Sequence, residues 1–500
     1  MRHCVVNFVR KGLLCLGLTL LQPAVFAVAS PIDPALSSAE ITQLTKEAYW
    51  WGSQQVGFYE LRHLFTQMEQ SPAYRGINRL GQNRRLFTAK ERFATTPNSS
   101  TLYSGGFFDV SKEPIVVLTS KVEGPPRYWS VMSADPYARY FFLIGSQSTG
   151  NEAQRYVIVG PHWRGQLPEG LRGVEVIRSP SDAFQTTLRV GVTPKDESDI
   201  AIALQLMDGF MMMPLSMWQK HGNQPLPLAQ QPKVKGDYRS FPRMDQITDL
   251  AKSALPTDYL QLASLVINDP SMTKRTDSIK EADVLRHLTR LGLREGQEFD
   301  PADLTEQQKV AVDEGFRLGR IEARAIFEKS LIDMNGWKLQ TSLDYDETNF
   351  ALRAGAADIA WGSPVPYQSH TIAFGLLDAQ GQPLDGKYRY TLTFDVDKLP
   401  PVTDFWELPM YDEFGYFVDN PIDRYSVTSM MYRTGAFAVK NGKLTFYLQA
   451  DRPTDPEQAR NWLPIPAGTK FQMAPRFYGP TASLIDGSYM MPKIVRVSAP

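Results

Sequence analysis

The sequence predicts a mainly β protein with helices, in which two β-sandwich-like domains are joined by a helical segment. Short apolar runs separated by Gly, Pro and Asn recur over 95–195 and again over 365–500, and this spacing is typical of sandwiches and barrels. Pro (36), Gly (35), Phe (26) and Tyr (21) are plentiful, as expected for turn-rich β structure. Between the two β regions, residues 241–330 are charged and show helical spacing of apolar side chains.

The N-terminus has the pattern of a secretory signal peptide. Arg10 and Lys11 precede an apolar run of about ten residues, which is too short to span a bilayer. Small residues then offer cleavage sites that end at Ala27 or Ala29. We therefore expect residues 1–29 to be a signal peptide and the protein to be periplasmic or secreted, with an uncleaved anchor as the alternative.

Removal of this segment has a chemical consequence. Cys4 and Cys15 both lie within it, so the processed chain is expected to contain no disulfide, thiol nucleophile or thiolate metal ligand. No later stretch reaches 18 uninterrupted apolar residues. The sequence therefore predicts no transmembrane anchor after processing.

Local signals divide the rest of the chain. We predict an N-terminal β-rich domain with flanking helices over 37–217, a Pro-rich linker over 218–240, a helical segment over 241–335 and a C-terminal β-sandwich over 336–500.

Short sequence motifs predict where two helices begin and where one tight turn lies. Ser37 with Glu40 opens a helix over 37–65, and Thr305 with Gln308 opens one over 305–327. Residues 197–217 are expected to be helical through the Met211–Met213 run, whose side chains fill gaps in the core. The Asn-Gly pair at 441–442 predicts a tight hairpin turn.

Several function classes lack support in the sequence. A formal net charge of -1 gives no sign of a nucleic-acid partner. No Gly-x-Ser-x-Gly elbow, GxGxxG, P-loop or HExxH motif is present, and no two histidines of the processed chain lie at metal-ligand spacing. We therefore predict no metal and no cofactor. The oligomeric state stays open.

Long motifs in both halves resemble a bacterial family pair of unknown function, DUF1254 in the N-terminal half and DUF1214 in the C-terminal half. The N-terminal motifs are 97-PNSSTLYSGGFFDVSKEPIVV-117 and 156-YVIVGPHWRGQLPEG-170. The C-terminal motifs are 378-DAQGQPLDGKYRYTLTF-394, 399-LPPVTDFWELPMYDEFGYFVDNPIDRYSV-427, 461-NWLPIPAG-468 and 476-RFYGP-480. The resemblance implies two β-sandwich-like domains with helical material between them, and it implies little chemistry. This sequence has Ser99 and Ser100 where the family pattern has Arg and Asp, so any chemistry of that charged pair is in doubt here.

Polar and aromatic side chains form the candidate ligand site. Flat aromatic faces combined with directed hydrogen bonds suit a sugar or a carboxylate. The candidates are Asn98, Tyr103, Arg189, Tyr411, Asp412, Asn420, Arg424, Asn461, Trp462 and Arg476.

Each candidate also has a structural alternative. Asn-Pro and Asp-Arg are common at turns of β domains. Arg189 is equally a candidate to pair with Asp109 or Glu113 on neighbouring runs, and Arg424 to pair with Asp412 or Asp423.

The site hypothesis makes a prediction about position. We expect Arg424 and Tyr411 to line the main cavity near Asn98 and Tyr103, because domain junctions are favoured places for ligand clefts. No catalytic residue is identified.

Three functions are compatible with the sequence. The first is a periplasmic protein that binds a small polar molecule or glycan fragment at a cleft between the β domains. Whether it also processes this molecule stays open. The second is a non-enzymatic envelope factor whose aromatic surface contacts another protein. The third is a hydrolase with a triad assembled in space, for which Ser99, Ser100 and Ser104 are the serines near the strongest motif. Convergent polar groups around a cleft would favour the first function, and a flat apolar patch the second.

Overall fold

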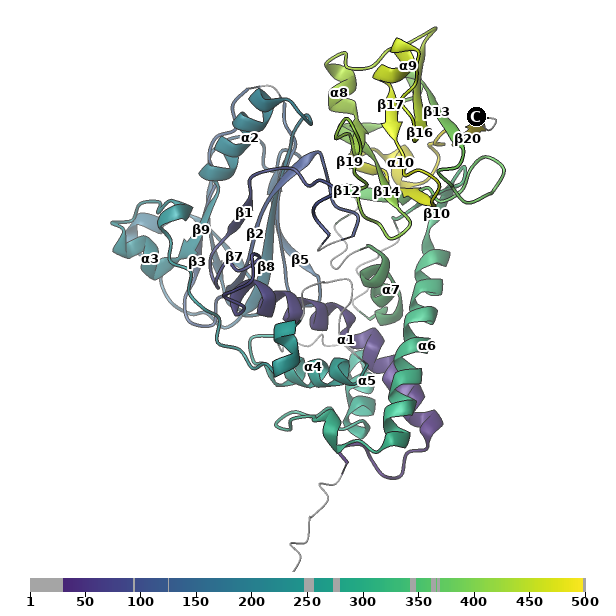
Figure 1. Ribbon diagram of the computed structural model, residues 1–500. Helices are drawn as coiled ribbons and strands as arrows, with labels where there is room; N and C mark the ends of the chain where they lie inside the picture. The colour runs from purple at the N-terminus through teal and green to yellow at the C-terminus, as the bar shows by residue number, and fades with distance from the viewer. Residues whose placement is uncertain are drawn as a thin grey trace, which may run out of the picture.

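The chain folds into two β-sandwiches held together by a layer of helices (Figure 1). The computed structural model describes residues 30–92, 95–124, 126–246, 256–272, 279–341, 348–360, 366 and 369–497. The expected signal peptide, 1–29, lies outside these residues. Among the described helices, none is long and apolar enough to cross a membrane.

The N-terminal sandwich packs a five-stranded sheet against a four-stranded one. The five-stranded sheet has the order β1-β2-β8-β4-β5, and the four-stranded sheet the order β7-β6-β3-β9. The strands are β1 Gly81–Asn83, β2 Thr101–Asp109, β3 Ile115–Leu118, β4 Trp129–Ala134, β5 Tyr140–Gly145, β6 Arg155–Val159, β7 Glu175–Arg178, β8 Ala183–Gly191 and β9 Met211–Pro214. Two helices flank them, α2 Glu197–Gly209 and α3 Leu215–Lys220.

The central strand β8 shows why only one face of the five-stranded sheet is closed. Side chains alternate between the two faces of a strand. Phe184 and Leu188 belong to the buried core between the sheets, together with Ile115 and Val117 of β3. Gln185, Thr187 and Arg189, which alternate with these residues along β8, point to the opposite face, which carries the candidate site.

The C-terminal sandwich is a closed unit with its own core. A seven-stranded sheet, in the order β10-β11-β12-β19-β14-β15 with β18 beside β14, faces a four-stranded sheet, β17-β16-β13-β20. Apolar side chains at every second position of the strands fill the space between the two sheets. Examples are Leu392 and Phe394 of β13, and Trp406 and Leu408 of β14.

The elements of this unit are β10 Ile332–Met334, β11 Trp337–Leu339, β12 His370–Phe374, β13 Arg389–Asp395, β14 Val402–Asp412, β15 Ser426–Thr428, α8 Ser429–Arg433, β16 Lys443–Gln449, α9 Pro456–Arg460, β17 Trp462–Pro464, β18 Phe471–Met473, β19 Arg476–Pro480, α10 Ala482–Ile485 and β20 Val495–Val497. The predicted Asn-Gly turn is confirmed, because Asn441 and Gly442 both have positive φ (51° and 73°).

The helical layer combines segments from the start and the middle of the chain. Helix α1, Ser38–Thr66, packs chiefly on α6, Glu306–Ser330, and also on α4 Pro256–Asn268, α5 Ile279–Arg290 and α7 Phe350–Ala360. Both predicted capping boxes are present, Ser37 with Glu40 and Thr305 with Gln308. In Figure 1 these helices lie beneath the C-terminal unit and beside the five-stranded sheet, so they connect the two sandwiches.

One predicted element is wrong. The helix expected over 197–217 ends at Gly209, and the methionines after it form β9, which pairs with β3. Phe210 already has an extended backbone, and Met212 and Met213 are fully buried. A fully apolar run of this length suits a buried strand as well as a helix, and pairing with β3 decides between them.

Candidate functional site

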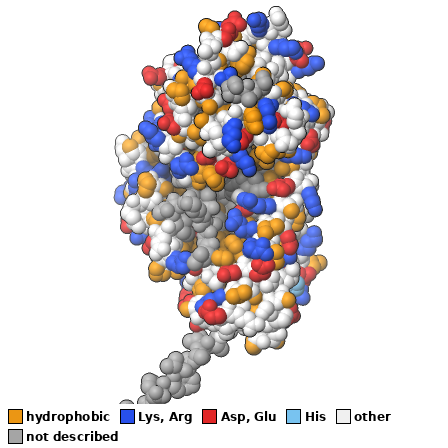
Figure 2. Space-filling model, turned by 45° about the vertical axis from the view of Figure 1, so that its right-hand side comes forward, with side chains coloured by type: hydrophobic (Ala, Val, Ile, Leu, Met, Phe, Trp, Pro, Cys, Tyr) orange, Lys and Arg blue, Asp and Glu red, His pale blue; other side chains and the backbone are white. Residues whose placement is uncertain are grey.

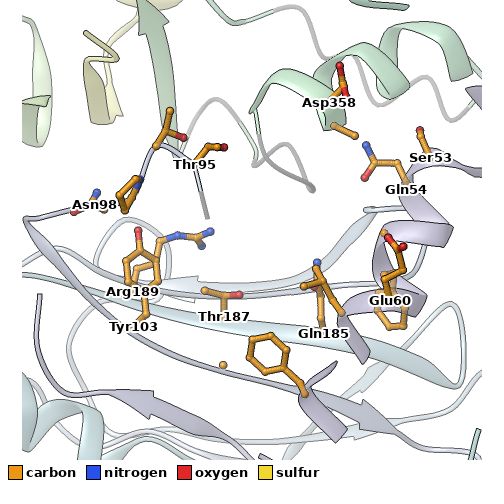
Figure 3. A pocket seen from close by; sticks show the side chains of 18 of the residues that line it. Ser53, Gln54, Glu60, Thr95, Asn98, Tyr103, Gln185, Thr187, Arg189 and Asp358 are labelled. Atoms are coloured by element: carbon orange, nitrogen blue, oxygen red, sulfur yellow. The ribbon is translucent and has the colours of Figure 1, made fainter. Parts of the chain in front are cut away.

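A cavity of about 830 Å³ lies where the N-terminal sheet, the helical layer and the C-terminal unit meet. Its walls come from β2 and β8, from α1, α6 and α7, from the 95–98 segment and from β12 and β19. Figure 2 shows the surface hollowed between the C-terminal unit and the rest of the molecule, and Figure 3 shows the lining side chains from within. The volume falls in the range of small-molecule sites.

The floor of the cavity is the open face of the five-stranded sheet. Gln185, Thr187 and Arg189 alternate along β8 and all line the cavity. Their partners on β2 are Phe107, Gly105 and Tyr103, which line it as well. Strand pleating therefore places a polar row on β8 beside the aromatic side chains of Phe107 and Tyr103 on one surface.

Arg189 points its guanidinium into the cavity, as Figure 3 shows. Its side-chain hydrogen bond runs from Nη1 to the sulfur of Met132 at 3.5 Å, and it lies 5.9 Å from the ring centroid of Tyr103. Within the described chain, no carboxylate forms an ion pair with it, so the proposed pairs with Asp109 and Glu113 do not exist. Asp109 instead accepts from Ser111 and Tyr238, and Glu113 from Ser216. Arg189 thus retains donors and a positive charge that face the cavity.

A second arginine lies at the same end of the cavity but is fully engaged. Arg476 donates from Nη1 to the hydroxyl of Tyr411 at 2.6 Å and from Nη2 to the carbonyl of Thr96. Its Nη1 also lies 3.8 Å from Oε2 of Glu407, a fully buried carboxylate. Arg476 therefore ties the C-terminal unit to the 95–98 segment while it lines the cavity.

The 95–98 segment is held from both sides. Asn98 donates from Nδ2 to the hydroxyl of Tyr478 at 2.7 Å, and its Oδ1 accepts from the backbone N–H groups of Ser100 and Thr101. Tyr411 donates its hydroxyl to the carbonyl of Pro97 at 2.7 Å. These contacts fix the relative position of the two β domains at the edge of the cavity.

His370 lies near enough to both arginines to feel their charges, and it is neutral. Burial lowers its pKa well below the ordinary value, and the positive charges of Arg189 and Arg476 lower it further. The ring stacks on Tyr478 at 5.2 Å between centroids, and its buried Nδ1 makes no hydrogen bond in the described structure. Of the two cations, Arg476 lies near a buried carboxylate, Glu407, and Arg189 has no carboxylate partner among the described residues, so this end of the cavity favours an anion.

The opposite end of the cavity is lined by α1. Residues at helical spacing face it: Tyr49, Ser53, Val56, Gly57, Glu60 and Leu61. Glu60 is only 6% exposed, and burial together with the charge of Asp258 raises its pKa from 4.5 to about 8. Its carboxyl group is therefore largely protonated at neutral pH.

Two further arginines flank the cavity from α6. Arg320 contacts the carboxylate of Asp358 on α7 at 2.6 Å, and Arg324 pairs with the same carboxylate. Both arginines are about half exposed. In Figure 2, Lys and Arg side chains gather on the surface beside the hollow.

Four of the ten candidate residues line the main cavity: Asn98, Tyr103, Arg189 and Arg476. Tyr411 is fully buried behind Arg476. Arg424 lines a second cavity of about 660 Å³, so the prediction that these two residues line the main cavity is corrected. Nor does Arg424 pair with Asp412 or Asp423, because its Nη1 donates to the carbonyls of Arg460 and Trp462 at 2.8 Å each.

The remaining candidates hold turns and strands of the C-terminal domain. Asp412 accepts from the backbone of Phe414 and Tyr416, and Asn420 accepts from the backbone N–H of Arg424. Asn461 uses its whole amide on the backbone of Ala438 and Thr445. Trp462 is 1% exposed and donates to the carbonyl of Gln449 at 2.8 Å. These hydrogen bonds lie inside the domain, and Asp412 also lies 3.7 Å from Arg92 of the N-terminal half.

The serines near the first motif have partners other than histidine. The hydroxyl of Ser99 donates to Glu407 at 3.2 Å and lies 2.8 Å from that of Ser426, and Ser100 bonds Asn98. The hydroxyl of Ser104 is buried without a hydrogen-bond partner in the described structure.

Sequence reasoning missed His370, Glu60 and the row formed by Gln185 and Thr187. For the row, a signal existed, because Arg189 lies on a period-two run and its alternate neighbours share its face. An acid at helical spacing on the largely buried α1 was the signal for Glu60. Nothing in the sequence places α1 beside β8.

Comparisons with known proteins agree with this architecture. A protein family of unknown function, DUF1254, matches residues 77–214, and a second one, DUF1214, matches residues 370–482. No curated protein matches the chain.

Among solved structures, the crystal structure of the VPA0106 protein from Vibrio parahaemolyticus is similar to this chain. The two are 22% identical with a TM-score of 0.61, over 92% of this chain and all of that one. An uncharacterized protein from Burkholderia cenocepacia matches with 12% identity and a TM-score of 0.38, over 92% and 88% of the two chains. The first likeness is one of fold. With one family profile on each sandwich, the chain belongs to the two-domain DUF1254/DUF1214 family.

Proposed function

We propose that this protein binds a small polar molecule that carries an anionic group, in the cavity between its two β domains. The observation that carries the proposal is Arg189, a guanidinium that faces the cavity without a carboxylate partner in the described structure. A charge in such a place is costly unless a ligand pairs with it. Carboxylates, phosphates and acidic sugars all offer the required oxygens.

The surroundings of Arg189 support recognition of such a ligand. Tyr103 and His370 add flat faces, and Thr187 and Gln185 add hydrogen-bonding groups along the floor. Convergent polar groups of this kind favour ligand binding over the alternative of a flat interaction surface. We propose no chemical step, because the serines near the site contact groups other than histidine or, for Ser104, have no partner.

Location is part of the proposal. The charged and apolar N-terminus supports export to the periplasm, where the ligand would be an envelope component or an imported metabolite. The mass of the exported protein tests this: cleavage after Ala27 or Ala29 is expected, and an intact Met1 on membrane-bound protein would contradict it.

The test of binding compares two arginines of the same domain. Arg189→Met removes the cavity cation, and Arg172→Met removes an exposed arginine beside β7. Thermal melts are recorded with a library of carboxylates and phosphate esters. A ligand at about a hundred times its Kd stabilises the folded state by about 2.7 kcal/mol. We expect stabilisation of the parent and of Arg172→Met, and its loss in Arg189→Met. Equal stabilisation of all three proteins would overturn the proposal.

A further inference from the structure

Glu60 is a buried carboxyl group that the fold does not explain. It is 6% exposed, lines the main cavity, and makes no hydrogen bond or ion pair with any described residue. Burying an unpaired polar group costs stability, so such groups are rare in folded proteins and call for a reason. A leucine at this position of α1 would pack with the apolar stripe and avoid that cost.

The groups around Glu60 do not satisfy it. On α1, Gln54 donates its amide to the carbonyl of Arg353, and the amide of Gln55 is itself buried without a partner in the described structure. On α4, Asp258 is ion-paired with Arg243 at 2.8 Å. Burial, and then the negative charge of Asp258, favour the protonated form of Glu60, so at neutral pH its O–H is available as a donor.

Geometry places this donor far from the anion end. Gln185 and Arg189 lie on the same face of β8, four residues apart, which corresponds to about 13 Å along the strand. Figure 3 shows Glu60 beside Gln185, with Arg189 and Tyr103 at the other end of the cavity. The apolar faces of Phe107, Tyr259 and Phe316 also line this cavity.

We infer that Glu60 forms a second subsite, which donates a hydrogen bond to an uncharged carbonyl or hydroxyl oxygen of the ligand. The ligand is then elongated, with an anionic group at Arg189 and a neutral acceptor at Glu60. This inference rests on the proposed function, because the position of the anion orients the rest of the molecule. A second negative charge at Glu60 is disfavoured, since it would lie in a buried site without a counter-ion.

Three probes with the same ten-carbon chain, and one shorter probe, test this inference by calorimetry at pH 7. Sebacate monoamide has a carboxylate and a neutral acceptor, sebacate has two carboxylates, and decanoate has an apolar tail. One neutral hydrogen bond corresponds to roughly a five- to ten-fold difference in Kd. We expect the monoamide to bind about that much more tightly than both decanoate and sebacate. Glutarate monoamide, which is too short to reach both ends, should bind no better than decanoate.

Two variants separate a binding role from a structural one. Glu60→Gln retains a donor and should keep the preference for the monoamide. Glu60→Leu should lose the preference while its melting temperature is not lower than that of the parent, because the buried polar group is gone. Equal binding of decanoate and the monoamide, tighter binding of sebacate, or a preference retained in Glu60→Leu would each overturn the subsite and leave the anion site standing. Failure of every probe to bind would overturn the anion site itself.

Discussion

Arg189 and Glu60, beside the N-terminal sheet, have fewer hydrogen-bond partners than two arginines of the C-terminal domain. On the side of the N-terminal sheet and α1, Arg189 has one weak bond to a sulfur atom and Glu60 has none with described residues. In the C-terminal domain, Arg476 donates to a hydroxyl and a carbonyl and lies near a carboxylate, and Arg424 donates to two carbonyls. The unsatisfied groups lower stability and stay open to a ligand, and the satisfied ones stabilise the fold. Residue type alone does not distinguish them.

The largest expected effect comes from the open carboxyl group of Glu60. Its pKa rises from 4.5 to about 8 on folding, so between these pH values the folded state holds a proton that the unfolded chain releases. Stability from this group therefore falls as pH rises from about 5 to 8, and the loss approaches a limit of about 5 kcal/mol above pH 8. Melting temperatures of the parent and of Glu60→Gln across this pH range should diverge, with the flatter profile in the variant. Parallel profiles would show that Glu60 is not an unsatisfied acid.

The next largest effect is expected at Arg476, on the satisfied side. Arg476→Met leaves the buried carboxylate of Glu407 without its cation and removes the bonds to Tyr411 and Thr96. We expect a loss of about 3–5 kcal/mol in the free energy of unfolding, measured with urea. Adding Glu407→Gln should recover part of it, since the unpaired charge is then removed.

A matched control shows whether the loss at Arg476 is specific. Arg452 is exposed in a loop of the same domain, and Arg452→Met should leave stability unchanged within about 0.5 kcal/mol. A loss at Arg476 no larger than the loss at Arg452 would contradict the role of Arg476 between the domains.

The smallest loss of stability is expected at Arg424, the second satisfied arginine of the C-terminal domain. Arg424→Met leaves the carbonyls of Arg460 and Trp462 without their donor, at a cost of about 2 kcal/mol. Ligand affinity should not change, because Arg424 lines the second cavity and not the main one. Lost affinity with intact stability, judged against Arg452→Met, would instead place the ligand in that second cavity.

Local sequence patterns were sufficient for much of the fold. Capping boxes at Ser37 and Thr305 marked the starts of α1 and α6, and Asn441-Gly442 marked a tight turn. These signals depend on hydrogen bonds and backbone angles within a few residues, so they do not need the rest of the chain. Local patterns predicted the wrong element for the Met211–Met213 run, because the strand with which it pairs, β3, lies about a hundred residues earlier.

The candidate site was predictable only in part. Asn98, Tyr103, Arg189 and Arg476 were identified by chemical type, and they do line one cavity. Arg424, Asn461 and Trp462 had the same chemistry, but nearby backbone groups in the folded domain occupy them. Whether a polar side chain is satisfied depends on which groups fold against it, and composition does not contain that information.

The sequence by itself determined the two β units and the starts of α1 and α6, and the period-two alternation of β8 contains the signal that puts Gln185, Thr187 and Arg189 on one face. Only the tertiary structure decided that this face is open. It also brought α1, more than a hundred residues earlier, across that face, so that Glu60 lies opposite Arg189 in one cavity. The physical reason is that the cavity is built by long-range packing of α1 on α6 and by contacts between the two β domains, and both depend on the whole chain being folded.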